Sequence, residues 1–229
     1  MNNIAIIPAR GGSKRIPRKN IKDFLGKPII AYSIEAAINS KLFHEIMVST
    51  DDVEIAEIAL EYGAKVPFFR SNKNSNDYST TIDVVKEVIS EYKQIFNSDF
   101  ENGCCIYPTA PLLKIDHLKS GYNKLIFDDY TTVFSAVEFS YPIWRGLYVN
   151  DESIAKMIWP QHLNDRSQDL QKVYHDAGQW YWFKTQKLTD SFFSEKSAIV
   201  KLDEMEVQDI DNLVDWDIAE LKYKIHVNL

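Results

Sequence analysis

The chain has 229 residues, of which 45% are hydrophobic and 13% aromatic, so it can fill a large core and an intrinsically disordered protein is excluded. No apolar stretch approaches the roughly 20 residues that a membrane span needs, and the N-terminal residues lack the pattern of a secretion signal, so a cytoplasmic protein without a membrane partner is expected. The formal net charge of −7 argues against nucleic acid as a partner, because an acidic surface repels a long phosphate backbone.

Short β-rich runs alternate with longer segments of helical spacing in the first half of the chain. The predicted strands are 4–8, 45–50, 104–107 and 131–137, and the predicted helices are 29–38, 53–62 and 82–96. Asp51 and Asp52 can cap the second helix, and Gly63 follows its end. The alternation predicts an α/β fold of the Rossmann-like type, with a mainly parallel sheet between helices. Ligands of such sheets lie beyond the carboxyl ends of the strands.

The loop behind the first strand, PARGGSKRIPRKN at residues 8–20, concentrates positive charge. Residues 10–27 contain seven Lys or Arg and one acid, Asp23. Two glycines allow backbone N–H groups to approach phosphate oxygens, and the cations supply the counter-charge. The spacing fits neither G-x-x-x-x-G-K-[ST] nor G-x-G-x-x-G, which disfavours an ATPase or a dinucleotide oxidoreductase. We therefore expect a nucleotide or a phosphorylated metabolite here; the alternative is a solvated basic loop.

The alternation of strands and helices breaks near residue 141. Residues 141–174 are rich in Trp, Pro, Asp and Gln without a clean period, and their large apolar side chains need a partner surface. We predict that they form a dimerisation arm inserted into a single domain of residues 1–229, and hence a homodimer. The alternative is a long excursion folded over its own domain. Cys104 and Cys105 are sequence neighbours, which favours buried thiols over a disulfide or a metal site.

Residues 8–37, PARGGSKRIPRKNIKDFLGKPIIAYSIEAA, resemble the opening of the bacterial CMP-sialic acid synthetase (acylneuraminate cytidylyltransferase) family. Further pieces follow in that family's order over almost the whole chain: VSTDDVEIAEIALEYGA, FFR, YPTAPL, RSQDL and QDID. The resemblance implies a nucleotidyltransferase fold. It also implies a reaction of CTP with a nine-carbon 2-keto sugar acid that yields the CMP-sugar and pyrophosphate.

The resemblance also implies roles for residues at matching positions. Arg10 and Lys14 would hold the triphosphate, and Lys19 would stabilise the transferring phosphate. Where the family commonly has Gln-Pro-Thr-Ser-Pro, this chain has Tyr107 at the first position, so the base contact there is either a phenol or backbone. The predicted catalytic residues are Arg10, Lys19 and Asp211, and the predicted nucleotide-binding residues are Ala9, Arg10, Gly11, Gly12, Ser13, Lys14, Asn20, Arg70, Ser79, Thr81 and Tyr107.

The pair Asp209-x-Asp211 precedes a predicted terminal helix. Alone, such a pair is more often a helix cap and a surface turn. Together with the basic loop and the family resemblance, it predicts an Mg²⁺ site, because magnesium is bound through one or two carboxylates and substrate phosphates. We expect Asp211 to be the direct ligand and Asp209 to hold a second metal ion or a metal-bound water. The anomeric hydroxyl would be deprotonated by Asp211 or by a metal-bound hydroxide.

The sugar side carries the discriminating residues. Arg166 in RSQDL stands where the family places a cation for the sugar carboxylate, which a guanidinium can bind bidentately. The segment YHDAGQWYW at residues 174–182 replaces the Arg-x-Asn-Gly type of segment found in sialic acid synthetases. RSQDL and YHDAGQWYW together resemble the pseudaminic acid cytidylyltransferase branch. The predicted sugar-binding residues are Arg166, Gln168, His175, Asp176 and Gln179.

Three alternatives stay open on the sequence alone. His175 is either a sugar contact or a packed histidine bonded to Asp176. Of Trp180 and Trp182, we expect one to face the pocket and the other the core. The substrate could instead be N-acetylneuraminic or legionaminic acid, or the chain could be a non-catalytic nucleotide-binding protein. The resemblance implies a product that serves surface-glycan biosynthesis or flagellin glycosylation.

Overall fold

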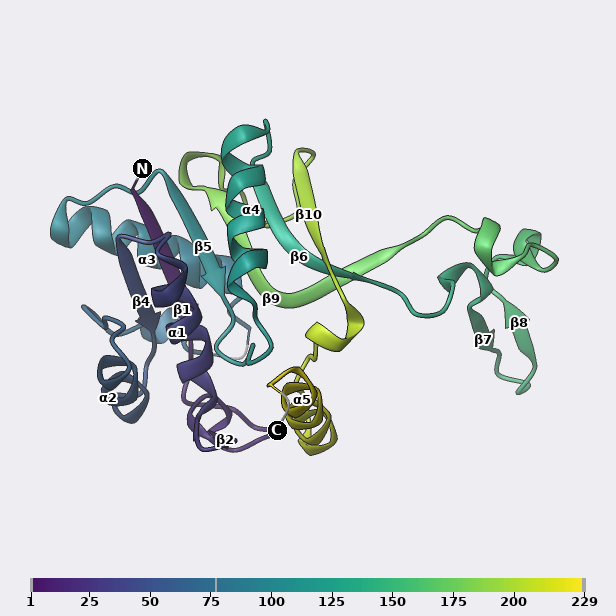
Figure 1. The fold of residues 1–229 in the computed structure, drawn as a ribbon, viewed down its shortest axis with the longest axis horizontal. Helices are drawn as coiled ribbons and strands as arrows, with labels where there is room; N and C mark the ends of the chain where they lie inside the picture. Colours follow the sequence, from purple (N-terminus) through teal and green to yellow (C-terminus); the bar gives the residue numbers. More distant parts are fainter. Residues whose placement is uncertain (1, 77, 228–229) are drawn as a thin grey trace.

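A computed structural model describes residues 2–76 and 78–227, and its centre is a six-stranded sheet in the order β10-β6-β9-β5-β1-β4 (Figure 1). The strands are β1 (Asn3–Pro8), β4 (Glu45–Ser49), β5 (Asn102–Ile106), β6 (Thr132–Glu138), β9 (Tyr174–Lys184) and β10 (Ser197–Leu202). Only β9 runs antiparallel to its neighbours among these described strands. The predicted Rossmann-like, mainly parallel α/β fold is therefore confirmed.

Helices cover both faces of the sheet. They are α1 (Ile29–Ser40), α2 (Val53–Glu61), α3 (Thr81–Phe96), α4 (Ile115–Phe127) and α5 (Leu213–Val227). Apolar residues of α1, α2 and α4 share one buried cluster with alternate residues of β1, whereas α3 packs on the opposite face (Figure 1). Helix α5 packs through Trp216 on Phe24 of the short hairpin formed by β2 (Asp23–Phe24) and β3 (Lys27–Pro28).

The remaining elements are short. They are β7 (Leu147–Val149), β8 (Ala155–Met157) and the 3-10 turns η1 (Lys19–Ile21), η2 (Asn72–Asn74), η3 (Ile143–Arg145), η4 (Pro160–His162), η5 (Ser167–Asp169), η6 (Thr185–Lys187) and η7 (Glu204–Glu206). None of the helices in the described part of the chain is both long and apolar enough to cross a bilayer. Cys104 and Cys105 are both buried and unpaired, as expected.

The expected capping of α2 is half correct. The Asp52 carboxylate accepts a hydrogen bond from the Ile55 amide at 3.0 Å, and Gly63 follows the helix with a φ of 89°. Asp51 does not cap the helix. Its carboxylate instead accepts a hydrogen bond from the amide of Gly11, in the basic loop, at 2.9 Å.

The expectation that Trp180 and Trp182 face different environments was wrong. Residues two apart in a strand point to the same face, and both indoles are fully buried on the face of β9 that α4 covers. Tyr181, between them, lies on the opposite face. Gly121 of α4 leaves room for the two indoles, since a Cβ there would lie 2.5 Å from Trp180 and 3.0 Å from Trp182.

Gly121→Ala should lower the free energy of unfolding by about 1–3 kcal/mol, because overpacking against two fixed indoles outweighs the gain in helix propensity. Denaturant unfolding would measure the change. Asn123→Ala, at an exposed position of the same helix, is the matched control and should leave stability unchanged or slightly increased. A Gly121→Ala protein more stable than the wild type would contradict this packing.

The segment predicted as an arm leaves the sheet after β6 and returns in β9. It carries the hairpin β7–β8 and three of the 3-10 turns, and it projects away from the rest of the molecule (Figure 1). Its exposed apolar side chains include Leu147, Val149 and Leu163. The arm therefore does not fold back over its own domain.

Candidate active site

A cleft of about 560 Å³ opens at the carboxyl ends of β1 and β5. It is lined by the basic loop, by the segment that leads into α3 and by the loop after β5, that is by Pro8, Arg10, Ser13, Lys14, Arg15, Lys19, Asn20, Arg70, Asn74, Asn76, Ser79, Thr80, Thr81, Val84, Tyr107, Pro108 and Thr109. Most of the predicted nucleotide-binding residues thus share one cavity. Ala9, Gly11 and Gly12 are not among the described residues that line it.

The cations of the basic loop divide into two groups. Arg10, Lys14, Arg15 and Lys19 line the cleft. The other three do not line it and contact other parts of the protein: Arg18 pairs with Asp52 and Glu54, Lys22 lies 5.0 Å from the Trp216 ring centroid, and Lys27 pairs with Glu35. The number of cations that face the cleft is therefore smaller than the sequence count suggests.

Lys19 joins the basic loop to the carboxylate pair. Its Nζ donates a hydrogen bond of 2.7 Å to the carbonyl of Ile210, the residue between Asp209 and Asp211. Burial lowers the pKa of Lys19, an effect that the two carboxylates partly oppose. Two motifs separated by 191 residues in the sequence thus meet at one edge of the cleft.

Asp209 and Asp211 lie near two cations of the basic loop, Arg15 and Lys19. Asp211 forms an ion pair with Arg15 at 2.7 Å. Burial, and next the charge of Asp211, raise the pKa of Asp209, whereas Lys19 lowers it. The Asp215 carboxylate accepts a hydrogen bond from the Asp211 amide at 2.9 Å, which fixes the turn before α5.

A magnesium ion fits this donor set. No group of three or more His, Cys, Asp or Glu suited to a metal ion occurs in the described residues, so the protein does not provide a complete coordination cage there. Two hard carboxylates beside a cationic cleft match an ion that takes its remaining ligands from substrate phosphates and water. Because burial and next the charge of Asp211 raise the pKa of Asp209, a bound cation would stabilise the ionised form of Asp209.

The far end of the cleft is built from the loop after β5, the segment that leads into α3 and the start of α3. The Tyr107 hydroxyl lies 3.1 Å from the Thr81 hydroxyl, and burial raises the pKa of the phenol. Arg70 is buried, and its Nε donates to the Ser49 hydroxyl at 3.1 Å. The Ser79 hydroxyl donates to the carbonyl of Lys73 at 3.0 Å. Arg70, Ser79, Thr81 and Tyr107 thus give this part of the cleft a polar lining.

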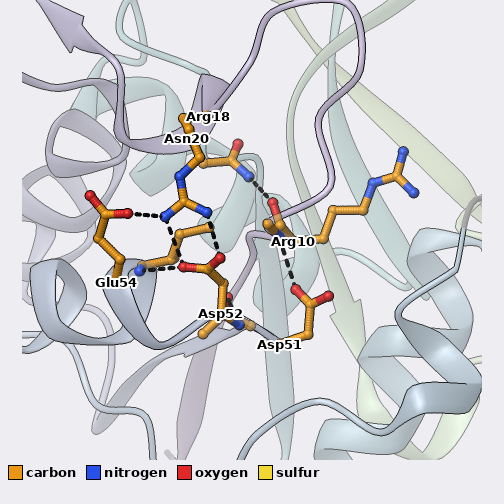
Figure 2. Close-up of polar contacts among 9 residues, drawn as sticks. Arg10, Arg18, Asn20, Asp51, Asp52 and Glu54 are labelled. Atoms are coloured by element: carbon orange, nitrogen blue, oxygen red, sulfur yellow. Dashed lines mark hydrogen bonds and ion pairs between the residues drawn. The ribbon is translucent and has the colours of Figure 1, made fainter.

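Figure 2 shows how the basic loop is held at its ends. The Asn20 side-chain amide donates to the carbonyl of Arg10 at 2.9 Å. The Gly11 amide is engaged by Asp51, and the Ala9 amide donates to the Ser49 carbonyl at 2.9 Å. Two of the predicted nucleotide-binding backbone groups therefore already have protein partners.

A second cavity, of about 300 Å³, lies beside Asp209. Its wall includes His175 and Asp176 of β9, together with Lys222 of α5. The Asp176 carboxylate accepts hydrogen bonds from the Tyr181 hydroxyl at 2.5 Å and from the Gly178 amide at 2.9 Å. His175 is exposed, and its Nδ1 lies 2.9 Å from the Asp176 carbonyl rather than from the carboxylate.

The other three predicted sugar-binding residues are not brought to either cavity. Gln179 is buried, and its Nε2 donates to the Glu206 carbonyl at 2.6 Å. Arg166 lies on the arm, where it pairs with Asp169 at 2.7 Å. Gln168 also lies on the arm, at a separate cavity of about 290 Å³. Within one chain, the arm residues do not meet the cleft.

Sequence reasoning missed two charged residues of the site. Lys222 donates to the carbonyls of Glu204 and Val207, at 2.9 and 2.6 Å, and lines the cavity beside Asp209. No local signal distinguishes it from the other lysines of a terminal helix. Arg15 was counted only as part of the basic loop, although its charge opposite a carboxylate pair could have suggested the ion pair with Asp211.

Comparison with known proteins places the chain among enzymes of one kind. Residues 4–208 match the family model described as Cytidylyltransferase. The chain is 48% identical to the pseudaminic acid cytidylyltransferase of Campylobacter jejuni, over 99% of this chain and 98% of that protein. It is 31% identical to the CMP-N,N'-diacetyllegionaminic acid synthase of Legionella pneumophila, over 96% and 95% of the two chains. The solved structure of CMP:2-keto-3-deoxy-manno-octonic acid synthetase complexed with CTP superposes with a TM-score of 0.68 at 17% identity, covering 100% of both chains, and shares the fold.

Proposed function

Because the chain belongs to the cytidylyltransferase family, we propose that it transfers CMP from CTP to the anomeric hydroxyl of pseudaminic acid and releases pyrophosphate. The observation that carries the proposal is the contact of Lys19 with the Ile210 carbonyl, because it brings the basic loop next to the carboxylate pair. Since the relative named for pseudaminic acid is more similar than the one named for diacetyllegionaminic acid, pseudaminic acid is the favoured acceptor.

In this proposal, the triphosphate occupies the cationic half of the cleft. Arg10, Lys14 and Arg15 bind the phosphates that leave as pyrophosphate, and Lys19 stabilises the charge that develops on the transferring phosphate. The base lies at the far end, against Thr81 and Tyr107. Catalysis then depends on cations and on the alignment of the acceptor, without a protein nucleophile.

Asp211 and Asp209 would hold magnesium. When bound, the ion would neutralise phosphate charge as a Lewis acid. Arg15, which pairs with Asp211 at 2.7 Å, would then be released toward the phosphates.

The acceptor would occupy the cavity beside Asp209. Its C2 hydroxyl oxygen forms the new bond to the α-phosphorus of CTP while the bond from that phosphorus to the pyrophosphate oxygen breaks. A carboxylate oxygen of Asp211 is the proposed acceptor of the hydroxyl proton. Lys222 and His175 line this cavity and could contact the carboxylate or the acylamino groups of the sugar. We place the reaction in the cytoplasm, upstream of a glycosyltransferase.

The proposal is tested by incubating the purified protein with CTP, Mg²⁺ and pseudaminic acid and identifying the products by mass spectrometry. We expect a CMP–sugar conjugate and pyrophosphate in equal amounts, and neither when the acceptor or Mg²⁺ is omitted. Unchanged CTP under these conditions, with a protein that binds CTP, would favour a non-catalytic nucleotide-binding protein.

We also propose a homodimer in which the arm of each subunit supplies Arg166 to the sugar site of its partner. Two observations support this arrangement: the exposed apolar side chains of the arm, and the lack of arm residues among the described residues that line its own cleft. The protein should then sediment as a dimer at micromolar concentration. An active, stable monomer would refute the proposal.

Mixing two inactive variants tests whether the arm completes the partner's site. In a heterodimer of Lys19→Ala and Arg166→Ala, one of the two sites would combine an intact cleft with an intact arm. After random subunit exchange, about a quarter of the wild-type activity should therefore return. A mixture no more active than the two separate variants would show that Arg166 does not act across subunits.

A further inference from the structure

The two ends of the basic loop are tied to a single turn, the one between β4 and α2. At the first end, the Gly11 amide donates to the Asp51 carboxylate at 2.9 Å. At the second end, Arg18 donates to both oxygens of the Asp52 carboxylate, at 2.5 and 2.9 Å, and to the Glu54 carboxylate at 2.5 Å (Figure 2). Bidentate, charge-assisted pairs of this kind fix orientation as well as distance.

Asp52 is itself held firmly. Its carboxylate caps α2 through the Ile55 amide, and its own amide donates to the Thr50 hydroxyl at 3.1 Å. A Cβ on Gly11 would lie 2.6 Å from Asp52 Oδ2, so the loop backbone packs directly on this carboxylate. The pKa of Asp52 lies below its usual value, mainly because of Arg18, and the carboxylate is therefore ionised at neutral pH.

Arg18 has a backbone conformation that a residue with a Cβ rarely adopts. Its φ and ψ are 56° and 29°, in the left-handed region. This conformation starts the η1 turn, which carries Lys19 and Asn20. Lys19, whose Nζ donates to the Ile210 carbonyl, thus directly follows the residue that pairs with Asp52.

We propose that Arg18, Asp51 and Asp52 are positioning residues, an inference that rests on the proposed function. They hold the basic loop in the geometry that binds the phosphates before CTP arrives. None of the three is among the described residues lining the cleft. Their effect on CTP must then pass through the loop, by keeping Arg10, Lys14 and Lys19 on one wall.

Removing either partner of the Arg18–Asp52 pair should weaken CTP binding by a similar factor. If the basic loop keeps its binding geometry in only about one protein molecule in ten, the apparent Kd for CTP rises about tenfold. Arg18→Met and Asp52→Asn test this, since Asn still caps a helix. The double variant should also show about a tenfold rise, because both changes remove one interaction. Arg18→Lys keeps the charge but not the planar fork, and should lie between the wild type and Arg18→Met.

The measurements are the Kd for CTP by calorimetry, the separate kcat and KM for CTP, and the melting temperature. Lys93→Met breaks an exposed ion pair on α3 and is the matched control, with wild-type values expected. A lower melting temperature with an unchanged Kd would mean that the pair only stabilises the fold. A raised Kd in Arg18→Met but not in Asp52→Asn would mean that Arg18 binds the phosphates directly. Either result overturns the proposal, as does a hundredfold loss in the double variant.

A second readout is independent of CTP. Trypsin can cleave within residues 10–20, and a loop released from the turn should be cut faster in Asp52→Asn than in the wild type, although all its basic residues are retained. If Asp52→Asn is cleaved faster but the wild-type protein does not bind CTP, the proposed function is contradicted while the anchoring of the loop is supported. Equal cleavage and equal Kd values, with CTP bound by the wild type, would contradict the anchoring alone.

Discussion

Lys19→Met should lower kcat by about 10³-fold while leaving the fold intact, because it removes a partly buried cation that we propose stabilises the transferring phosphate. The Met side chain keeps most of the apolar stem, so packing changes little. Pyrophosphate release at saturating CTP and acceptor measures the loss. Lys22→Met is the matched control, since Lys22 belongs to the same loop but lies over Trp216, and its kcat should stay near the wild-type value.

The pH dependence gives a second test of Lys19. Burial places its pKa below the usual 10.5, and the cation is lost as the pH rises through that lowered value. The kcat of the wild type should therefore fall on the alkaline side at a lower pH than an ordinary lysine would require. A kcat that stays constant through that range, or an equal loss in Lys22→Met, would contradict the role given to Lys19.

Asp211→Asn should lower kcat by at least about 10²-fold and raise the Mg²⁺ concentration needed for half-maximal activity, because a neutral amide is a poor ligand for a hard cation. A magnesium titration of pyrophosphate release measures both effects. Asp217→Asn, at an exposed position of α5, is the control. If the two variants required the same Mg²⁺ concentration and turned over equally, the assignment of Asp211 would be wrong.

The first half of the fold could be predicted because local signals agree there. The strands at 4–8 and 45–50 and the helix at 53–62 have clear periodicity and end signals, and the structure has them within one or two residues. Helix α4 was not predicted: it has a glycine, Gly121, in its interior and no side-chain cap at Lys114. The antiparallel insertion of β9 depends on contacts with β5 and β6 that no local pattern encodes.

The site was predictable where it follows from topology. The loops after β1 and β5 meet because the carboxyl ends of parallel strands share one edge of the sheet, and Arg10, Lys19 and Tyr107 line the cleft as expected. The contact of Lys19 with Ile210 could not be derived, since it depends on how α5 packs on the β2–β3 hairpin. The partners of Gly11 and Arg18 were hidden because Asp51 and Asp52 were interpreted only as helix caps.

The central claim is the transfer of CMP to pseudaminic acid, and the most direct measurement compares acceptors. Pyrophosphate release should be followed with CTP and Mg²⁺ in parallel reactions with pseudaminic, N-acetylneuraminic and N,N'-diacetyllegionaminic acid. We expect kcat/KM for pseudaminic acid to exceed the others by at least about 10²-fold, because buried polar groups left unpaired by a wrong acceptor are costly. A higher kcat/KM for either of the other two acids would contradict the claim about the acceptor, and no release with any of them would contradict the transfer itself.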